Sequence, residues 1–228
     1  MDLNTYSDHV ALKEALGALM KADPVIADLA GRYGVPVLDK KSLTDFTVEG
    51  EETLAGSVDD RLFYELVEVV LHQQLAGKAA VAITGRFKAA LDNCVTPEKV
   101  ICCDQEVLRA TGLSGAKLAA IRGLALAIDN EAVSLSSIAE LGDEEIIWEL
   151  SKLRGFGPWS AQMFLMFSLG RLDVWPSGDL GVRKGYRRSY RLEAVPTAKE
   201  LSILGDRFRP YRSLVAWYMW KSLADPSD

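Results

Sequence analysis

The sequence predicts an all-α protein, and three observations support this fold class. Apolar residues recur at helical spacing along nearly the whole chain, no stretch shows a convincing strand-like alternation, and caps and helix breakers separate the periodic segments. The chain has 228 residues, of which 49% are hydrophobic. It is therefore long enough to bury a substantial core in one domain or two small lobes.

Local signals bound the first elements. A helix over HVALKEALGALM ends before Asp23-Pro24, where a second short helix begins. Residues 35–56 are the least regular part and are expected to hold a loop or short strands. Ser57 and Asp60 form a capping-box pattern that opens the helix DRLFYELVEVVLHQQL, and AGKAAVAITGRFKAAL forms the next helix.

Two helix–turn–helix units of similar build follow. The first, QEVLRATGLSGAKLAAIRGLALAI, turns at Thr111-Gly112 and has Ser114 as the cap of its second helix. The second, DEEIIWELSKLRGFGPWSAQMFLMFSLG, turns at residues 155–157. No long linker or low-complexity tract interrupts this succession of helices.

Composition excludes several classes of protein. No apolar run reaches the roughly 18 residues of a membrane-spanning helix, and the N-terminus MDLNTYSDHVALKEAL lacks the pattern of a secretion signal. Cys94, Cys102 and Cys103 have neither metal-ligand spacing nor the even count of a disulfide framework, which favours a reducing, intracellular compartment. His9 and His72 are too few and too far apart for a familiar metal site.

The charge is unevenly distributed. The formal net charge is −6, but residues 171–221 carry eleven Lys and Arg against five Asp and Glu, while the rest of the chain carries fifteen against twenty-seven. A basic segment on an acidic body is typical of a protein with a confined polyanion-binding face. A solvated helix surface explains the charge equally well, so charge alone leaves both interpretations open.

The stretch LRGFGPWSA predicts a tight helical hairpin. Gly155 and Gly157 supply backbone freedom for the reversal, and Pro158 suits the first position of the following helix. That helix, WSAQMFLMFSL, is apolar almost all round and must be buried. The free amides at its start form a site for a phosphate oxygen. An ordinary αα-hairpin remains the alternative for this motif taken alone.

Asp179 follows a Pro-Ser-Gly turn at the head of a basic helix, in VWPSGDLGVRKGY. Alone, it would be interpreted as a helix cap. LRGFGPWSAQ followed by DVWPSGDLGVRKGY, however, resembles the signature of the helix-hairpin-helix (HhH-GPD) DNA glycosylases, in which a catalytic Asp follows a Gly-rich hairpin. LHQQLAGKAAVAITGRF and FRPYRSLVAWYMW are also similar, specifically to the alkylation-repair branch of 3-methyladenine DNA glycosylase II type. The resemblance covers about residues 60–221.

The resemblance implies a bilobal helical fold with an active-site cleft between the lobes. Residues 1–70 would pack with residues 179–228 as one lobe. Residues 71–178 would form the central lobe, which contains the helix-hairpin-helix at about 143–169. Asp179 would lie at the cleft as the catalytic residue, where its carboxylate stabilises the positive charge of the breaking glycosidic bond or activates water.

The resemblance also implies how DNA is held. The hairpin is expected to contact DNA through Gly155, Gly157 and Ser160, and the earlier turn through Ser114 and Lys117. Gln74 matches the position of the wedge that fills the place of the extruded base, with Gln73 and Leu75 beside it. A solvated cap explains Ser114 and Lys117 equally well, and a helix end explains the wedge residues without the family match. Relatives often bind a monovalent cation, Na⁺ or K⁺, through hairpin carbonyls, here those of Ser151, Leu153 and Phe156. No other cofactor is expected.

The base pocket implied by the resemblance contains Trp159 and Trp220, whose indoles would stack on a cationic alkylated base. Some relatives have further aromatic residues where this chain has Met163 and Leu180, a departure that leaves its base preference open. Bifunctional members carry a nucleophilic Lys where this chain has Trp159, so no strand-cleaving lyase activity is expected. Core packing is the alternative for Trp220.

The expected function is excision of 3-methyladenine and 7-methylguanine from double-stranded DNA by a monomeric enzyme, leaving an abasic site. The expected location is the cytoplasm, with the nucleoid, in a bacterium, or the nucleus in a eukaryote. Two alternatives remain open. One is a glycosylase of the same fold for hypoxanthine or ethenoadenine, and the other is a non-catalytic protein that binds damaged DNA.

Overall fold

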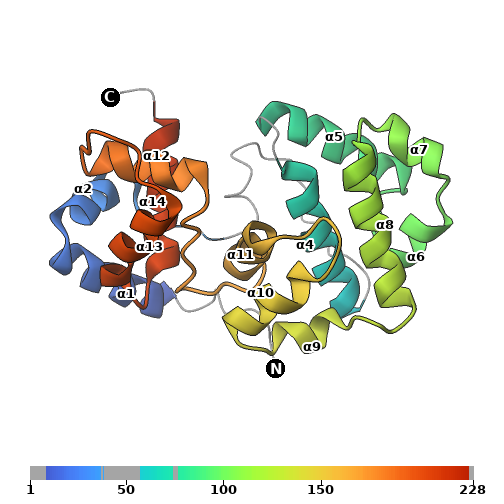
Figure 1. The fold of residues 1–228 in the computed structure, drawn as a ribbon, viewed down its shortest axis with the longest axis horizontal. Coiled ribbons are helices and arrows are strands. Elements are labelled where there is room, and N and C mark those ends of the chain that lie inside the picture. Colours follow the sequence, from blue (N-terminus) through green and yellow to red (C-terminus); the bar gives the residue numbers. More distant parts are fainter. Residues whose placement is uncertain (1–8, 37, 39–56, 74–76, 226–228) are drawn as a thin grey trace. The chain divides into compact units, whose positions relative to one another are not determined.

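The computed structural model describes residues 9–36, 38, 57–73 and 77–225. Every regular element in these residues is helical, which confirms the predicted all-α class (Figure 1). None of the described helices is both long and apolar enough to cross a membrane. The helices are α1 (His9–Ala22), α2 (Pro24–Tyr33), α4 (Val58–His72), α5 (Gly77–Ala90), α6 (Pro97–Cys102), α7 (Gln105–Ala110), α8 (Gly115–Asp129), α9 (Leu135–Ala139), α10 (Asp143–Ser151), α11 (Pro158–Phe167), α12 (Leu180–Ser189), α13 (Ala198–Gly205), the 3₁₀ turn η2 (Asp206–Phe208) and α14 (Arg212–Ala224).

Side chains cap two of the helices whose starts the sequence predicts. Oδ1 of Asp23 accepts hydrogen bonds from the backbone N–H groups of Val25 (2.9 Å) and Ile26 (3.3 Å) at the start of α2. Ser57 and Asp60 form a complete capping box at the start of α4. Each cap satisfies amides that have no partner within their own helix, so these boundaries follow from local sequence alone.

The chain divides into two compact units. Unit 1 comprises Met1–Asp39 and Leu165–Asp228, and unit 2 comprises Lys40–Phe164, so the boundary falls within α11. The lobes expected from the sequence were residues 1–70 with 179–228, and residues 71–178. The structure divides the chain differently, because α4 lies in unit 2 and residues 165–178 lie in unit 1. Helix α4 belongs to unit 2 because it packs against α5, α8 and α9. Most of the predicted irregular segment, 35–56, lies outside the described residues.

Unit 1 is built around α14. Leu214, Val215, Tyr218 and Met219 are completely or almost completely buried on this helix, which packs against α2 and α12. The approach of α12 is close, since a Cβ placed on Gly185 would lie 2.0 Å from the carbonyl oxygen of Met219. Only glycine at this position allows the two helices to approach so closely.

The buried carboxylate of Asp23 joins the start of α2 to residues of the basic segment 171–221. Oδ2 of Asp23 accepts a hydrogen bond from the hydroxyl of Tyr190 (3.0 Å) and forms an ion pair with Nη2 of Arg207 (2.9 Å). The guanidinium of Arg207 also lies over the rings of Tyr190 and Phe208, at 4.9 and 4.6 Å from their centroids. Asp23 therefore caps α2 and also holds residues that are distant in the sequence.

Unit 2 has α4 in its core. Leu62, Phe63, Leu66 and Val67 on this helix are 1% exposed or less. Its N-terminal turn is tied to α9 because Oδ1 of Asp59 accepts a hydrogen bond from the N–H of Ser136 (2.6 Å). The burial of α4 on several sides places its C-terminal end, at His72 and Gln73, against the other helices that carry predicted site residues.

Candidate active site

The hairpin of unit 2 connects α10 to α11 through residues 152–157. Gly155 adopts a φ of +89°, and a Cβ placed on it would lie 2.4 Å from the Cβ of Ala120 in α8. Phe156 is buried and its N–H donates to the carbonyl of Leu153 (3.1 Å). Both the backbone conformation and the packing against α8 therefore require glycine at position 155.

Unlike Gly155, Gly157 is not required by any close contact in the described structure. A Cβ placed on Gly157 would meet nothing within 4 Å in the described structure. Its carbonyl accepts the N–H of Ala161 (3.1 Å), so it precedes the first turn of α11, which contains no acidic residue. The start of α11 thus presents helix-terminal amides and open space to an anion approaching from outside the protein.

Ser160 and Gln73 contact each other inside unit 2. Nε2 of Gln73 donates hydrogen bonds to Oγ of Ser160 (2.8 Å) and to the carbonyl of Gly155 (3.2 Å). Ser160 is only 2% exposed. The structure therefore brings together two predicted DNA contacts, and it places the Gln73 amide on the hairpin.

Ser114 and Lys117 lie at the start of α8. Oγ of Ser114 accepts the N–H of Lys117 (3.3 Å), the helix cap expected from the sequence. Nζ of Lys117 donates to the carbonyl of Leu71 and to that of Gln73, both at 2.8 Å. Burial lowers the pKa of the Lys117 ammonium. This side chain therefore contacts the C-terminal end of α4.

The predicted cation and wedge residues lie at or just after the ends of α10 and α4 in the sequence. Ser151 is the last residue of α10, and the predicted cation site at the carbonyls of Ser151, Leu153 and Phe156 stays a prediction. The predicted wedge residues Gln74 and Leu75 lie outside the described residues. Within the described part of the chain, no group of three or more His, Cys, Asp or Glu side chains is arranged to hold a metal ion.

Asp179 lies in unit 1 and is both a cap and the acceptor of a distant side chain. Its Oδ1 accepts the N–H of Val182 (2.8 Å) at the start of α12 and the indole Nε1–H of Trp220 (2.9 Å) from α14. The cap expected for an isolated Asp at a helix start is therefore present. The second donor comes from 41 residues along the chain and holds the carboxylate in one orientation.

Trp220 is held beside Asp179 by close packing. Its ring lies 5.9 Å from that of Phe167, tilted by 36°. A Cβ placed on Gly181 would lie 2.9 Å from Cδ1 of Trp220 and 3.0 Å from Oδ1 of Asp179. Glycine at 181 leaves room for the indole to reach the carboxylate. The polar edge of the Trp220 indole is used in the hydrogen bond to Asp179, and its stacking on a base stays a prediction.

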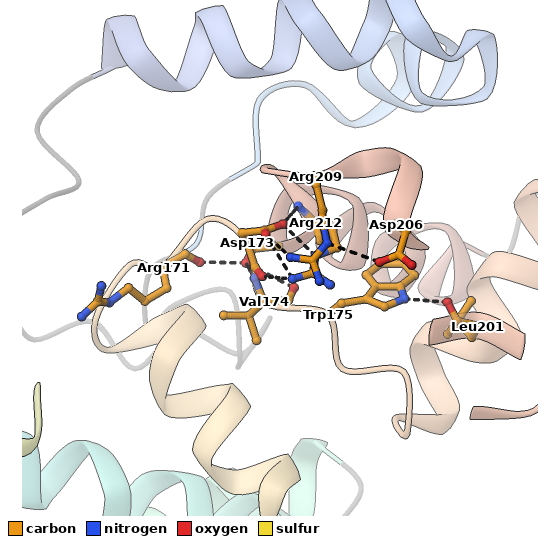
Figure 2. A network of polar contacts seen from close by, with 9 residues as sticks. Arg171, Asp173, Val174, Trp175, Leu201, Asp206, Arg209 and Arg212 are labelled. Carbon is orange, nitrogen blue, oxygen red and sulfur yellow. Dashed lines mark hydrogen bonds and ion pairs between the residues drawn. The ribbon is translucent and has the colours of Figure 1, made fainter. Parts of the chain in front are cut away.

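The segment that leads into Asp179 is anchored to the start of α14 (Figure 2). Asp173 and Arg212 form a bidentate ion pair, in which Oδ1 accepts a hydrogen bond from Nε (2.7 Å) and Oδ2 accepts one from Nη2 (3.0 Å). Oδ2 of Asp173 also accepts a hydrogen bond from Nη1 of Arg209 (2.9 Å). Oγ of Ser213 accepts the N–H of Val174 (2.9 Å). The backbone on the N-terminal side of Asp179 is therefore held by charged and neutral hydrogen bonds.

The remaining pocket candidates have different surroundings. Trp159 is the second residue of α11, in unit 2, and is partly exposed. Met163 on the same helix is 1% exposed and belongs to the core. Leu180, directly after Asp179, is 52% exposed. A common pocket for Trp159 and Trp220 stays a prediction because these residues belong to different units.

A comparison with known protein families shows to which family this chain belongs. The model described as "HhH-GPD superfamily base excision DNA repair protein" matches residues 67–210, well over half of the chain. The chain belongs to this superfamily. The match includes the hairpin, Asp179 and the anchored segment before it, and it confirms the resemblance seen in the sequence motifs.

Individual relatives of this HhH-GPD protein agree with that assignment. DNA-3-methyladenine glycosylase 1 of Schizosaccharomyces pombe is 39% identical over 168 residues, which cover 72% of this chain and 74% of the relative. The S. pombe enzyme Mag1, solved in complex with abasic DNA, superimposes with a TM-score of 0.72 and 31% identity over 91% of this chain and 95% of that chain. A DNA-3-methyladenine glycosidase from Bacillus halodurans superimposes with a TM-score of 0.63 and 29% identity over 88% and 89%.

Sequence reasoning missed the residues that anchor the segment before Asp179. Asp173, Arg212 and Ser213 lie within quoted motifs, but no spacing rule connects residues about 39 positions apart. Gly181 was also missed, although a glycine inside the first turn of a helix, where it lowers helix propensity, was an available signal. Trp220 was predicted as a residue of the base pocket, but its hydrogen bond to Asp179 was not predicted.

Proposed function

We infer that this protein is a DNA-3-methyladenine glycosylase of base excision repair, which acts on alkylated bases in DNA. The observation that carries the inference is the carboxylate of Asp179, held by the N–H groups of Val182 and Trp220 in a chain of the HhH-GPD superfamily. The 39% identity to the S. pombe glycosylase supports the same activity.

Asp179 suits the chemistry of glycosidic bond cleavage. As the bond from C1′ to the base nitrogen breaks, the base leaves with the electron pair and positive charge develops on the sugar. A fixed carboxylate stabilises that charge mainly in the transition state, and opposite charges 4 Å apart attract by about 4 kcal/mol at an effective dielectric of 20. Water then bonds to C1′ and gives up a proton, a step that a carboxylate can assist.

Two hydrogen bonds to one oxygen prepare Asp179 for this role. Because Val182 and Trp220 both donate to Oδ1, the carboxylate needs no reorientation when the positive charge appears. In this proposal, Trp220 contributes by orienting Asp179, in addition to the predicted stacking on the base.

The DNA backbone is expected to lie at the start of α11. The open space at Gly157 and the helix-terminal amides suit a phosphate oxygen, and the first turn carries no carboxylate that would repel it. A relative of the same family was solved with abasic DNA, which supports DNA as the partner. These contacts would hold the duplex while the damaged nucleotide leaves the stack.

We propose that 3-methyladenine and 7-methylguanine are the bases released and that the reaction ends at the abasic site. Both bases are already activated by alkylation, which fits a site whose proposed chemistry uses one carboxylate. Trp159 occupies the position of the nucleophilic Lys of bifunctional relatives, so the proposed enzyme cannot form a Schiff base there. Hypoxanthine and ethenoadenine belong in the test as competing substrates.

The direct test is base release from N-methylated duplex DNA by the native protein and by Asp179→Asn, with chromatographic identification of the base. Asparagine can also cap a helix, so this variant is expected to fold and to bind DNA. Asp104→Asn is a matched control, because Asp104 caps α7 through the N–H of Glu106 (2.7 Å) and has no proposed catalytic role. Release by the native protein and Asp104→Asn alone supports the proposal, whereas full activity of Asp179→Asn contradicts it.

A further inference from the structure

The C-terminal end of α4 is held by a cation from another helix. Nζ of Lys117 in α8 donates to the carbonyls of Leu71 and Gln73, each at 2.8 Å. The last carbonyls of a helix lack partners within it, and the negative end of the helix dipole lies there. Two of the three ammonium N–H groups of Lys117 are therefore used inside unit 2.

The side chain of Gln73 extends this contact to the hairpin. While its backbone carbonyl accepts Lys117, its Nε2 donates to the carbonyl of Gly155 (3.2 Å) and to Oγ of Ser160 (2.8 Å). The hairpin is also in direct contact with α8, because Gly155 lies against Ala120. The end of α4, the start of α8 and the hairpin are thus connected in a closed set of contacts.

On the basis of the proposed glycosylase function, we propose that Lys117 is a positioning residue, which holds the end of α4 in register with the phosphate-binding hairpin and so supports duplex opening. Lys117 acts through Gln73 and does not itself neutralise a phosphate. The sequence predicted a DNA contact for Lys117. The geometry favours an internal role, because Nζ of Lys117 donates to the carbonyls of Leu71 and Gln73 in the protein itself.

Two further features agree with an internal role. Burial lowers the pKa of the Lys117 ammonium, whereas a cation that awaits a phosphate is usually solvated. Ser160, the partner of Gln73, is buried and so belongs to the support of the hairpin, whereas Gly157 faces open space. Support and DNA contact are therefore separate tasks of neighbouring residues.

The test compares Lys117→Met with the native protein on two DNA substrates. In one the methylated base is paired in duplex DNA, and in the other the same base lies opposite an abasic site and so has no pairing partner. A misplaced α4 end is expected to slow single-turnover release from the paired substrate roughly 10- to 100-fold. Release from the unpaired substrate should change far less, because that base needs little energy to leave the stack. A merely structural loss of folded protein would lower both rates equally, and would contradict the proposal.

The salt dependence of DNA binding gives an independent measurement. Removal of a phosphate contact would reduce the slope of log K against log salt by about 1, whereas the proposal expects an unchanged slope. Lys99→Met is the matched control, since Lys99 is an exposed cation of unit 2 that pairs with Asp92, and it should alter neither rate nor slope. A reduced slope in Lys117→Met would overturn the positioning role.

Gln73→Glu keeps the test decisive if Lys117→Met fails to fold. A carboxylate cannot donate to the Gly155 carbonyl, so this variant breaks the contact with the hairpin and leaves Lys117 in place. It should show the same selective loss on paired substrate; an equal loss on both substrates, or none, would contradict the proposal. Base release by the native protein, measured in parallel, separates a failure of this inference from a failure of the glycosylase function.

Discussion

The indole Nε1–H of Trp220 donates a hydrogen bond of 2.9 Å to Oδ1 of Asp179. The same oxygen accepts the backbone N–H of Val182, so one carboxylate oxygen is fixed from two helices, α12 and α14. This relationship gives Trp220 an orienting role that stacking on a base does not require.

Trp220→Phe should therefore lower base release while DNA binding persists. The variant keeps an aromatic ring but removes the N–H donor together with part of the indole ring system. Loss of a hydrogen bond to a charged group costs about 1.5–3 kcal/mol, or roughly 10- to 100-fold in rate. Single-turnover release measures the effect. Trp217→Phe on the same helix is the control, since within the described structure the buried Nε1 of Trp217 has no hydrogen-bond partner. Equal rates for both variants would show that the Trp220 bond does not matter.

Gly155→Ala and Gly157→Ala should separate folding from DNA binding. Gly155 has a φ of +89° and lies against Ala120, so an added methyl group should reduce the free energy of unfolding by about 1–3 kcal/mol. Gly157 has open space around it, so its variant should keep the native melting temperature and bind DNA more weakly. Thermal unfolding and a DNA titration check the pair. Native DNA affinity in Gly157→Ala would argue against a phosphate at the start of α11.

Arg212→Met should destabilise the protein more than Arg209→Met. Arg212 donates to both carboxylate oxygens and to the backbone carbonyl of Asp173, and its side chain is mostly buried. Arg209 is half exposed and contributes one bond to the same carboxylate. The expected losses in unfolding free energy are about 2–4 kcal/mol for Arg212 and under about 1 kcal/mol for Arg209. Denaturant unfolding gives both values, and a reversed order would contradict the role assigned to the anchor.

Tyr190 should make the protein less stable at alkaline pH. Burial, and then the negative charge of Asp23, raise the pKa of the Tyr190 hydroxyl above its ordinary value of 10.0. Above about pH 10 the unfolded state loses this proton while the folded state keeps it, so the stabilisation is complete below pH 10 and is lost as the pH rises further. Unfolding measured between neutral and alkaline pH tests this. Tyr190→Phe should flatten the decline, and an identical decline in both proteins would exclude Tyr190 as its cause.

Much of the fold and part of the candidate site could be predicted from the sequence because their signals are local. The caps at Ser57 and Ser114 join atoms three residues apart, so residue type and spacing were sufficient. Helical periodicity predicted the all-α class for the same reason. The position of Asp179 after the hairpin identified the family, which the family comparison confirmed.

Tertiary structure alone decided the partners of these residues. Trp220 reaches Asp179 across 41 residues, Lys117 reaches Gln73 across 44, and Gly155 meets Ala120 through the packing of α8 on the hairpin. Such contacts depend on how helices pack, and no fixed spacing in the chain encodes them. The sequence by itself therefore determined the helices, their boundaries and the residues able to do the chemistry, whereas packing decided which of them orient the carboxylate and which support the hairpin.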